Sequence, residues 1–288
     1  MYRIEASAIS ENETHSDAGY RGCRAVVSTA PNVNSLSNYY QKVSAIKHEL
    51  ASEDDYIASP QKTGYRGVHL VYRYFSDKQA TSIYNGLKIE MQLRSQYQHA
   101  WATAVETVGT FVQEALKSSM GSEEWLRFFA LMGSAIALRE GTPLVPDAPT
   151  TRNELIRDLA HYTGQLNVVR RLQAYGDALK RIEGDTQNAH YYLLQLDPGA
   201  RQLLVTGFKA NEAEEAQDRY TEAERQCKDK PGTDAVLVSV ESVAALPRAY
   251  PNYFADTRVF VTLLLQALSG VQRRIQTKAL PLFPHTPG

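Results

Sequence analysis

The chain has 288 residues with 31 Lys and Arg against 32 Asp and Glu, so its formal net charge is −1. That length suits one large or two modest domains. The balanced charge excludes a generally basic nucleic-acid binder, so any contact with RNA would need a local basic patch. Cys23 and Cys227 have a spacing that suits neither a disulfide framework nor a zinc site, which predicts a reducing, cytoplasmic location. No apolar stretch approaches a membrane span and the N-terminus lacks a signal-peptide core, which favours a soluble protein without a membrane partner.

The first fifty residues divide into an irregular arm, a strand and a helix. Residues 1–21 lack periodicity and are rich in Ser, Glu, Asn and Thr, so we expect a loose or disordered arm. Residues 22–28 form an apolar run that predicts a buried strand. Residues 32–52 carry apolar side chains at helical spacing, which predicts a packing helix capped by Asn34 or Ser35.

The stretch 55–95 carries the strongest pattern in the chain. Pro60 and Gly64 mark a turn, residues 68–74 predict a strand, and residues 86–95 alternate strictly between apolar and polar side chains. The polar side of that second strand presents a carboxylate, an amide and a guanidinium in one row, namely Glu90, Gln92 and Arg94. Taken alone, such a row is usually a solvated strand face.

If the two strands pair, four chemically different side chains converge on one cleft: Lys62, Tyr65, His69 and Glu90. An aromatic ring, a cation and a carboxylate are what a purine nucleotide with phosphates and Mg²⁺ requires, because the base needs a stacking face and the metal a hard oxygen ligand. Taken singly, Tyr65 is more often turn packing and His69 more often a satisfied strand histidine. The group as a whole favours a nucleotide site.

The second half of the chain predicts helices followed by a small α/β module. Residues 96–118 and 125–139 predict helices, and residues 140–149 are rich in Pro and mark a boundary. Residues 150–184 predict one long amphipathic helix, whose apolar stripe is either a dimer seam or, as we favour, packs on its own domain.

The module itself spans 190–270. We expect it to contain a hairpin at 190–208, a helix at 211–228, a strand at 235–240 and a helix at 243–269. Because the module shows no nucleophile or ligand cluster, a regulatory role is favoured over a catalytic one. The tail 271–288 predicts a flexible end.

Three motifs carry a resemblance to a known family. G-Y-R-x-x-H at 64–69, E-x-Q-x-R at 90–94 and H-A-W-A at 99–102 resemble the synthetase domain of the RelA/SpoT family over residues 22–141. The resemblance implies a mixed β-sheet flanked by helices, an α/β (α+β) fold. It also implies transfer of pyrophosphate from ATP to the 3'-hydroxyl of GDP or GTP, which makes (p)ppGpp.

The same resemblance implies a role for each site residue. Tyr65 stacks on the acceptor base, and His69 and Lys62 contact the acceptor nucleotide; Gln61 stands where members place a Lys, and Lys62 substitutes for it or is merely solvated. Glu90 is the catalytic carboxylate that binds Mg²⁺, with Gln92 and Arg94 beside it as catalytic partners. Arg24 and His99 are supporting residues.

The N-terminal arm departs from the family pattern. Asp17 stands two residues ahead of the family's magnesium-binding Asp, which is about 7 Å along a strand. Codons for residues 17–21, read one base later, permit the family phrase M-Q-D-I-G, so we interpret residues 1–21 as truncated or frameshifted; the alternative is that degenerate codons permit many peptides. On our interpretation the ATP-binding segment is lost and the activity of this chain is impaired.

Residues 249–254 and the preceding hairpin resemble the C-terminal part of single-chain toxin–antitoxin members of the family, the CapRel-like proteins. That resemblance implies an alternative acceptor, the 3' end of tRNA, and a phage protein as the partner that the C-terminal module senses. A further alternative is a non-catalytic remnant that only binds nucleotides. The sequence leaves the acceptor open, and it leaves a homo-oligomer open as well.

Overall fold

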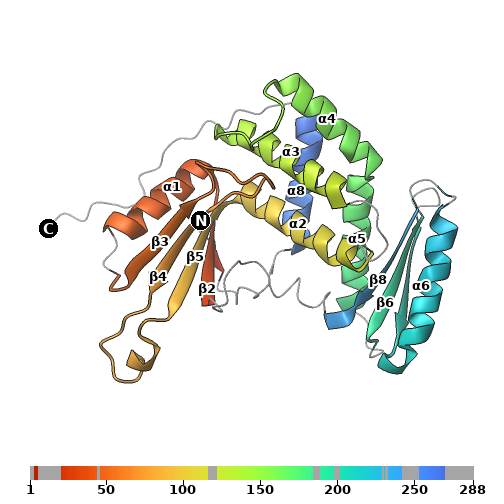
Figure 1. Cartoon of the computed structure of the whole chain (residues 1–288), viewed down its shortest axis with the longest axis horizontal. Helices are drawn as coiled ribbons and strands as arrows, with labels where there is room; N and C mark the ends of the chain where they lie inside the picture. Colours follow the sequence, from red (N-terminus) through yellow and green to blue (C-terminus); the bar gives the residue numbers. More distant parts are fainter. Residues whose placement is uncertain are drawn as a thin grey trace.

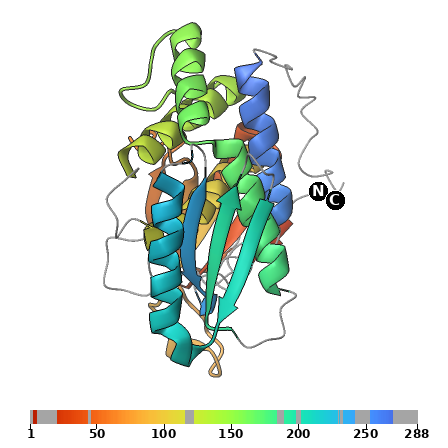
Figure 2. The ribbon, with the colours of Figure 1, turned by 90° about the vertical axis from the view of Figure 1, so that its right-hand side faces the viewer.

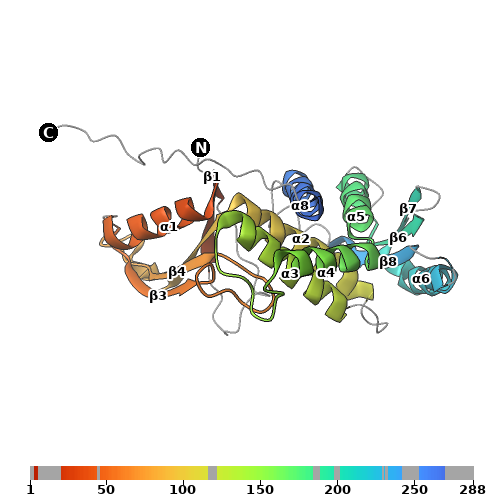
Figure 3. The ribbon, with the colours of Figure 1, turned by 90° about the horizontal axis from the view of Figure 1, so that it is seen from above.

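The computed structural model places two β-sheets at opposite ends of the molecule, with helices between them (Figures 1 and 3). A mixed sheet flanked by helices is the fold class that the sequence predicts, and it is confirmed. The structure describes residues 3–5, 21–43, 46–115, 122–183, 189–197, 202–228, 230, 233–241 and 253–269. Over these ranges no helix combines the length and the apolar character needed to cross a membrane.

The larger sheet has β5 at its centre and the order β1-β2-β5-β4-β3. β2 runs parallel to β5, whereas each other neighbouring pair is antiparallel. The predicted strands 22–28, 68–74 and 86–95 are therefore confirmed and lie side by side. The strands are β1 (Arg3–Glu5), β2 (Arg21–Val27), β3 (Glu49–Asp55), β4 (Val68–Arg73) and β5 (Lys88–Ser95).

Two predictions for the start of the chain need correction. Residues 3–5 were expected in a loose arm, but they form β1, because the side of β2 that faces away from β5 offers backbone groups that need partners. The helix predicted at 32–52 is α1 (Ala30–Asn38) followed by a π-helical turn to Val43. Its last residues instead form the exposed edge strand β3, whose acidic side chains hide any strand-like apolar alternation.

The helix α1 covers one face of the larger sheet. Thr29 caps it by accepting a hydrogen bond from the backbone N–H of Asn32 at 3.4 Å. Its Val33 packs with apolar side chains of β2, β4 and β5, among them Val27, Leu70 and Leu93. This small core fixes which face of β5 is apolar and leaves the other face to the polar row.

The middle layer grows directly out of β5, because α2 begins at the residue after that strand ends. An aromatic cluster of Trp101, Trp125, Phe128, Phe129 and Phe260 joins α2, α3 and the C-terminal helix α8. The predicted helix at 125–139 is confirmed as part of α3. The helices are α2 (Gln96–Ala115), α3 (Ser122–Glu140), α4 (Arg152–Gln165), α5 (Val168–Glu183) and α8 (Tyr253–Leu268).

The long helix predicted at 150–184 is wrong as a single element. It divides into α4 and α5 at Asn167, whose φ of 49° lies in the left-handed region that ends a helix. Asn tolerates that conformation better than most residues, so the backbone can change direction at this single residue. The apolar stripe is buried inside the chain on both halves, at Leu155, Leu159, Leu172 and Leu179, as the favoured interpretation expected.

The three-stranded antiparallel sheet has the order β7-β6-β8 (Figure 2). Helix α6 (Ala213–Lys228) packs on one face, and α5 with the end of α2 packs on the other, where Phe111 and Tyr175 stack at 4.3 Å. The predicted hairpin, helix and strand of the module are confirmed, whereas residues 249–252 and the tail 271–288 lie outside the described residues. The strands are β6 (Tyr191–Asp197), β7 (Gln202–Phe208) and β8 (Asp234–Ser239).

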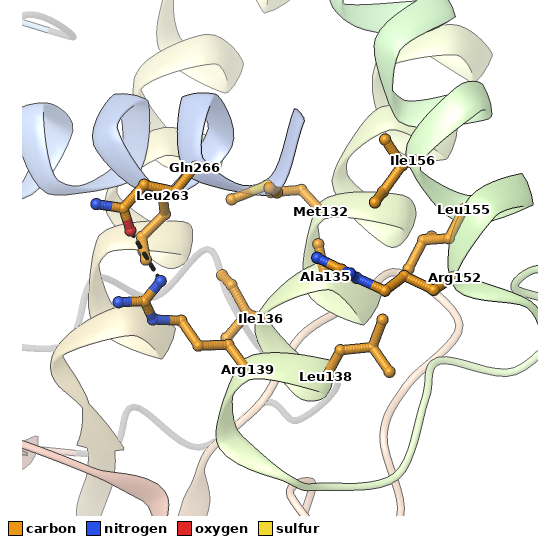
Figure 4. A pocket seen from close by; sticks show the side chains of 11 residues that line it. Met132, Ala135, Ile136, Leu138, Arg139, Arg152, Leu155, Ile156, Leu263 and Gln266 are labelled. Atoms are coloured by element: carbon orange, nitrogen blue, oxygen red, sulfur yellow. Dashed lines mark hydrogen bonds between the residues drawn. The ribbon is translucent and has the colours of Figure 1, made fainter. Parts of the chain in front are cut away.

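A cavity of about 40 Å³ lies between α3, α4 and α8 and is lined mostly by apolar side chains (Figure 4). At its edge Arg139 donates from Nη1 to Oε1 of Gln266 at 2.8 Å, which ties the end of α3 to α8. Because none of the side chains that line it belongs to the predicted nucleotide site, the cavity is a feature of the helix packing.

Candidate active site

The register of the larger sheet brings the predicted polar row together with its partners. Gln92 on β5 lies between Arg24 on β2 and His69 on β4, which are its direct neighbours across the strands. Glu90 lies two residues earlier on β5, and therefore on the same face of the sheet. Strand pairing alone thus assembles four of the predicted side chains.

Glu90 supplies the carboxylate of this group and is buried, with 5% of the residue exposed. Its Oε1 lies 2.6 Å from Nδ1 of His69, and its Oε2 accepts a hydrogen bond from Nε2 of Gln92 at 3.2 Å. Both carboxylate oxygens therefore have a partner from the protein. Each oxygen also keeps a further lone pair, because a carboxylate accepts at about four positions.

Tyr65 joins the loop before β4 to this group. Its hydroxyl oxygen lies 2.5 Å from Nε2 of His69 and accepts a hydrogen bond from Nη2 of Arg94 at 2.7 Å. Because an ionised Glu90 can only accept hydrogen bonds, Nδ1 of His69 carries a hydrogen and donates it to Glu90. The Tyr65 hydroxyl is then placed to donate to Nε2 of the same ring. The ring of His69 therefore connects Tyr65 to Glu90.

Gln92 holds the two arginines beside the carboxylate. Its Oε1 accepts from Nη2 of Arg94 at 3.0 Å and from Nε of Arg24 at 3.4 Å. We call Arg24, Tyr65, His69, Glu90, Gln92 and Arg94 the Glu90 network. It sets two guanidinium groups against one carboxylate on a largely buried face, and that charge balance suits an anionic ligand.

The environment of Glu90 favours its ionised form. Burial raises the pKa of Glu90, but the hydrogen bonds from His69 and Gln92 and the positive charge of Arg94 outweigh burial and hold that pKa below its ordinary value. A carboxylate that stays ionised is available as a metal ligand or a proton acceptor.

Close backbone packing fixes the loop that carries Tyr65. Gly64 has a φ of 95°, and a Cβ added there would lie 2.7 Å from the carbonyl oxygen of Phe129. A Cβ added at Gly133 on α3 would likewise lie 2.7 Å from the carbonyl oxygen of Gly64. Glycine is therefore required on both sides, and the loop rests directly on the backbone of α3.

Tyr56 is a member of the site that sequence reasoning missed. Its ring meets the rings of Tyr65 and His69 edge to face, at 5.6 and 5.3 Å between centroids. Its backbone N–H donates to the carbonyl oxygen of Gly67 at 2.9 Å, which pairs the end of β3 with the loop before β4. Only the β3–β4 pairing reveals this neighbour, and the first four residues of β3 were predicted as the end of a helix.

Two predicted residues are not brought into the Glu90 network, and a third lies outside the described residues. The ammonium of Lys62 pairs with Asp147 at 3.1 Å on the surface, where its side chain is 80% exposed. His99 is buried on α2 with 1% of the residue exposed, and its carbonyl oxygen accepts from Oγ1 of Thr103. Asp17 lies outside the described residues.

The described donor set fits Mg²⁺ as a partial site. Within the described ranges no group of three His, Cys, Asp or Glu side chains could hold a metal ion on its own. Mg²⁺ commonly takes one or two protein carboxylates and draws its remaining ligands from substrate phosphates and water. The free lone pairs of the Glu90 carboxylate meet that need for one ligand.

Comparison with known proteins identifies the part of the chain that holds the network. Residues 8–109 match a family model described as the region found in RelA/SpoT proteins. These residues are therefore similar to the RelA/SpoT region of known proteins. The match starts ahead of Gly22, the residue at which we expected the resemblance to begin, and ends within α2. No curated protein matches the chain.

Solved structures also resemble this chain. The small alarmone synthetase 1 from Bacillus subtilis bound to its product pppGpp has 18% identity and a TM-score of 0.35, over 42% of this chain and 57% of that one. The chain thus spans less than two thirds of that protein's length. A GTP pyrophosphokinase family protein from Streptococcus pneumoniae has 19% identity and a TM-score of 0.36, over 49% and 73%. The small alarmone synthetase 2 from Bacillus subtilis has 13% identity and a TM-score of 0.38, over 49% and 76%.

Proposed function

We propose that the RelA/SpoT region of this chain is a nucleotide pyrophosphotransferase site that moves pyrophosphate from ATP to the 3'-hydroxyl of GDP or GTP. The observation that carries this proposal is the Glu90 network, in which the two family motifs are hydrogen-bonded to each other on one sheet face. A set of merely solvated strand residues has no reason to be buried and bonded in this way.

In pyrophosphate transfer the protein contributes mainly by positioning the two nucleotides and by stabilising negative charge, and it need not form a covalent bond to the transferred group. The 3'-oxygen of the acceptor forms a bond to the β-phosphorus of ATP, the bond between that phosphorus and the oxygen bridging to the α-phosphorus breaks, and AMP leaves. Glu90 accepts the hydroxyl proton, and Arg24 and Arg94 stabilise negative charge on the phosphates. Mg²⁺, when bound, neutralises charge on the transferred group.

The acceptor nucleotide belongs beside Tyr65 in this proposal. Tyr65 offers a ring already held by its hydroxyl and by the neighbouring Tyr56, so base stacking there requires little ordering of the site. The family resemblance assigns the donor nucleotide to the segment ahead of β2, which in this chain we interpret as frameshifted; the structure describes residues 3–5 of it.

The test is calorimetric titration of the purified chain with GDP and GTP in the presence of Mg²⁺, with Tyr65→Ala as the matched variant. We expect heat of binding for the unaltered chain and weaker binding for the variant. A chain that binds neither nucleotide contradicts the proposal. Parallel titration with deacylated tRNA measures the alternative acceptor, and tighter binding of tRNA than of GDP or GTP replaces the proposed acceptor.

A further inference from the structure

Arg66 directly follows Tyr65 in the chain, yet it belongs to a different set of contacts. Its residue is 2% exposed. Its Nη2 donates to the carbonyl oxygen of Pro143 at 2.5 Å, and its Nη1 donates to Oγ1 of Thr142 at 3.3 Å. Both acceptors lie just after the end of α3, so the guanidinium binds the loop before β4 to a segment far away in sequence.

A buried carboxylate acts electrostatically on this guanidinium. Glu140, the last residue of α3, accepts from Nε2 of Gln98 at 2.9 Å. Burial raises the pKa of Glu140, while hydrogen bonds from Ser95 and Gln98 and the charge of Arg66 oppose that rise. Burial lowers the pKa of Arg66 to about 10, and Glu140 opposes that fall, so Arg66 remains charged at neutral pH.

Three successive residues of this loop therefore contact three different parts of the protein. Gly64 touches the backbone of α3, Tyr65 binds Arg94 and His69, and Arg66 binds the segment after α3. The end of α3 is itself held, because Arg139 binds Gln266 of α8 (Figure 4). Arg66 thus ties the loop to a part of the molecule that other contacts already fix.

We propose that Arg66 is a positioning residue for the acceptor nucleotide: its fork of donors holds the loop so that the ring of Tyr65 stays where the base stacks. The proposal rests on the proposed function of the same site. Arg66 acts through Tyr65 and touches no reacting atom. A planar guanidinium suits this task, because it binds two acceptors in fixed directions, whereas an ammonium does not.

The experiment separates positioning from simple support of the fold. Arg66→Met leaves Glu140 buried without its counter-charge and is expected to lower stability. The double variant Arg66→Met with Glu140→Gln removes that buried charge as well, so its unfolding midpoint should recover toward the unaltered chain. The control is Glu140→Gln alone, which keeps the bonds from Arg66 to Thr142 and Pro143.

We expect the double variant to bind GDP about tenfold more weakly than the unaltered chain by calorimetry, although its stability recovers. Glu140→Gln should bind GDP as the unaltered chain does. Unchanged GDP affinity in the double variant overturns the proposal, because Arg66 then only supports the fold.

Hydrogen exchange at residues 58–67 keeps this result apart from a failure of the proposed function. If the unaltered chain binds no GDP, the proposed function fails, but hydrogen exchange still measures how strongly Arg66 holds the loop. Faster exchange of these amides in the double variant than in Glu140→Gln supports the role of Arg66 in holding the loop. Equal exchange in the two variants overturns it.

Discussion

Nδ1 of His69 lies 2.6 Å from Oε1 of Glu90, and the other nitrogen of the same ring lies 2.5 Å from the hydroxyl oxygen of Tyr65. His69 therefore joins the loop that carries one family motif to the strand that carries the other. The consequence is that Glu90 keeps its charge in a buried position, because its pKa lies below the ordinary value despite burial.

This relationship predicts how stability depends on pH. A carboxyl group whose pKa is lowered in the folded state stabilises that state above the pKa it has when unfolded, and the contribution is lost as pH falls through the folded-state pKa. We expect the free energy of unfolding of the unaltered chain to fall more steeply on acidification than that of Glu90→Gln. Urea unfolding between neutral pH and about pH 3, followed by tryptophan fluorescence, measures both. Parallel profiles for the two proteins are incompatible with a lowered Glu90 pKa.

A second prediction concerns the base that we place on Tyr65. Stacking on an aromatic ring contributes about 1–3 kcal/mol per base, so Tyr65→Ala should weaken GDP binding by roughly tenfold or more. Tyr65→Phe is the matched control, since it keeps the ring and removes only the hydroxyl that binds His69 and Arg94. Calorimetry gives both affinities. Equal GDP affinity of Tyr65→Ala and the unaltered chain reduces Tyr65 to a packing residue.

The third prediction tests the close contact between Gly133 and Gly64. Gly133→Ala places a Cβ 2.7 Å from a backbone oxygen, so we expect a loss of about 1–3 kcal/mol in the free energy of unfolding and weaker GDP binding as the loop shifts. Gly176→Ala on α5 is the control, because nothing lies within 4 Å of the added Cβ, and it should stabilise α5 by about 0.5–1 kcal/mol. If Gly133→Ala behaves like Gly176→Ala, the loop does not depend on this contact.

The strand pairing and much of the candidate site were predictable from the sequence for a physical reason. Alternation along 86–95 fixes which side chains share a face, and pairing with 68–74 then brings His69 beside Gln92. Lys62 was expected in the same cleft, but it lies in a loop. Strand register therefore does not determine where its side chain points. In the structure its ammonium lies with Asp147 at the surface.

The features that sequence reasoning missed depend on single residues or on distant partners. The break between α4 and α5 rests on the left-handed backbone of Asn167, inside an otherwise regular apolar stripe. Strand β3 is exposed and acidic, so its sequence lacks the alternation of apolar and polar residues that would predict a strand. The contacts of Arg66 join residues 76 and 77 positions apart, which no local pattern reports.

A fourth prediction follows from the frameshift interpretation of residues 1–21: the polypeptide 1–288 keeps the acceptor half of the proposed site but does not complete the transfer. Phosphoryl-type transfer depends on positive charge placed around the phosphates, and ahead of β2 and at its first residue the chain offers only Arg3 and Arg21. We expect weak guanine-nucleotide binding, negligible ATP binding by calorimetry, and no labelled product. Robust synthesis by this chain contradicts the frameshift interpretation and makes residues 1–21 a working donor site.

The assignment of Glu90 as the transfer carboxylate is tested most directly by transfer of labelled pyrophosphate from ATP to GDP or GTP. On the frameshift interpretation, the chain with the upstream reading frame restored is compared with the same chain carrying Glu90→Gln, after circular dichroism has shown that both fold. We expect labelled product from the restored chain and none from the variant, because the variant loses both a metal ligand and its charge. Equal transfer by the two proteins contradicts the assignment.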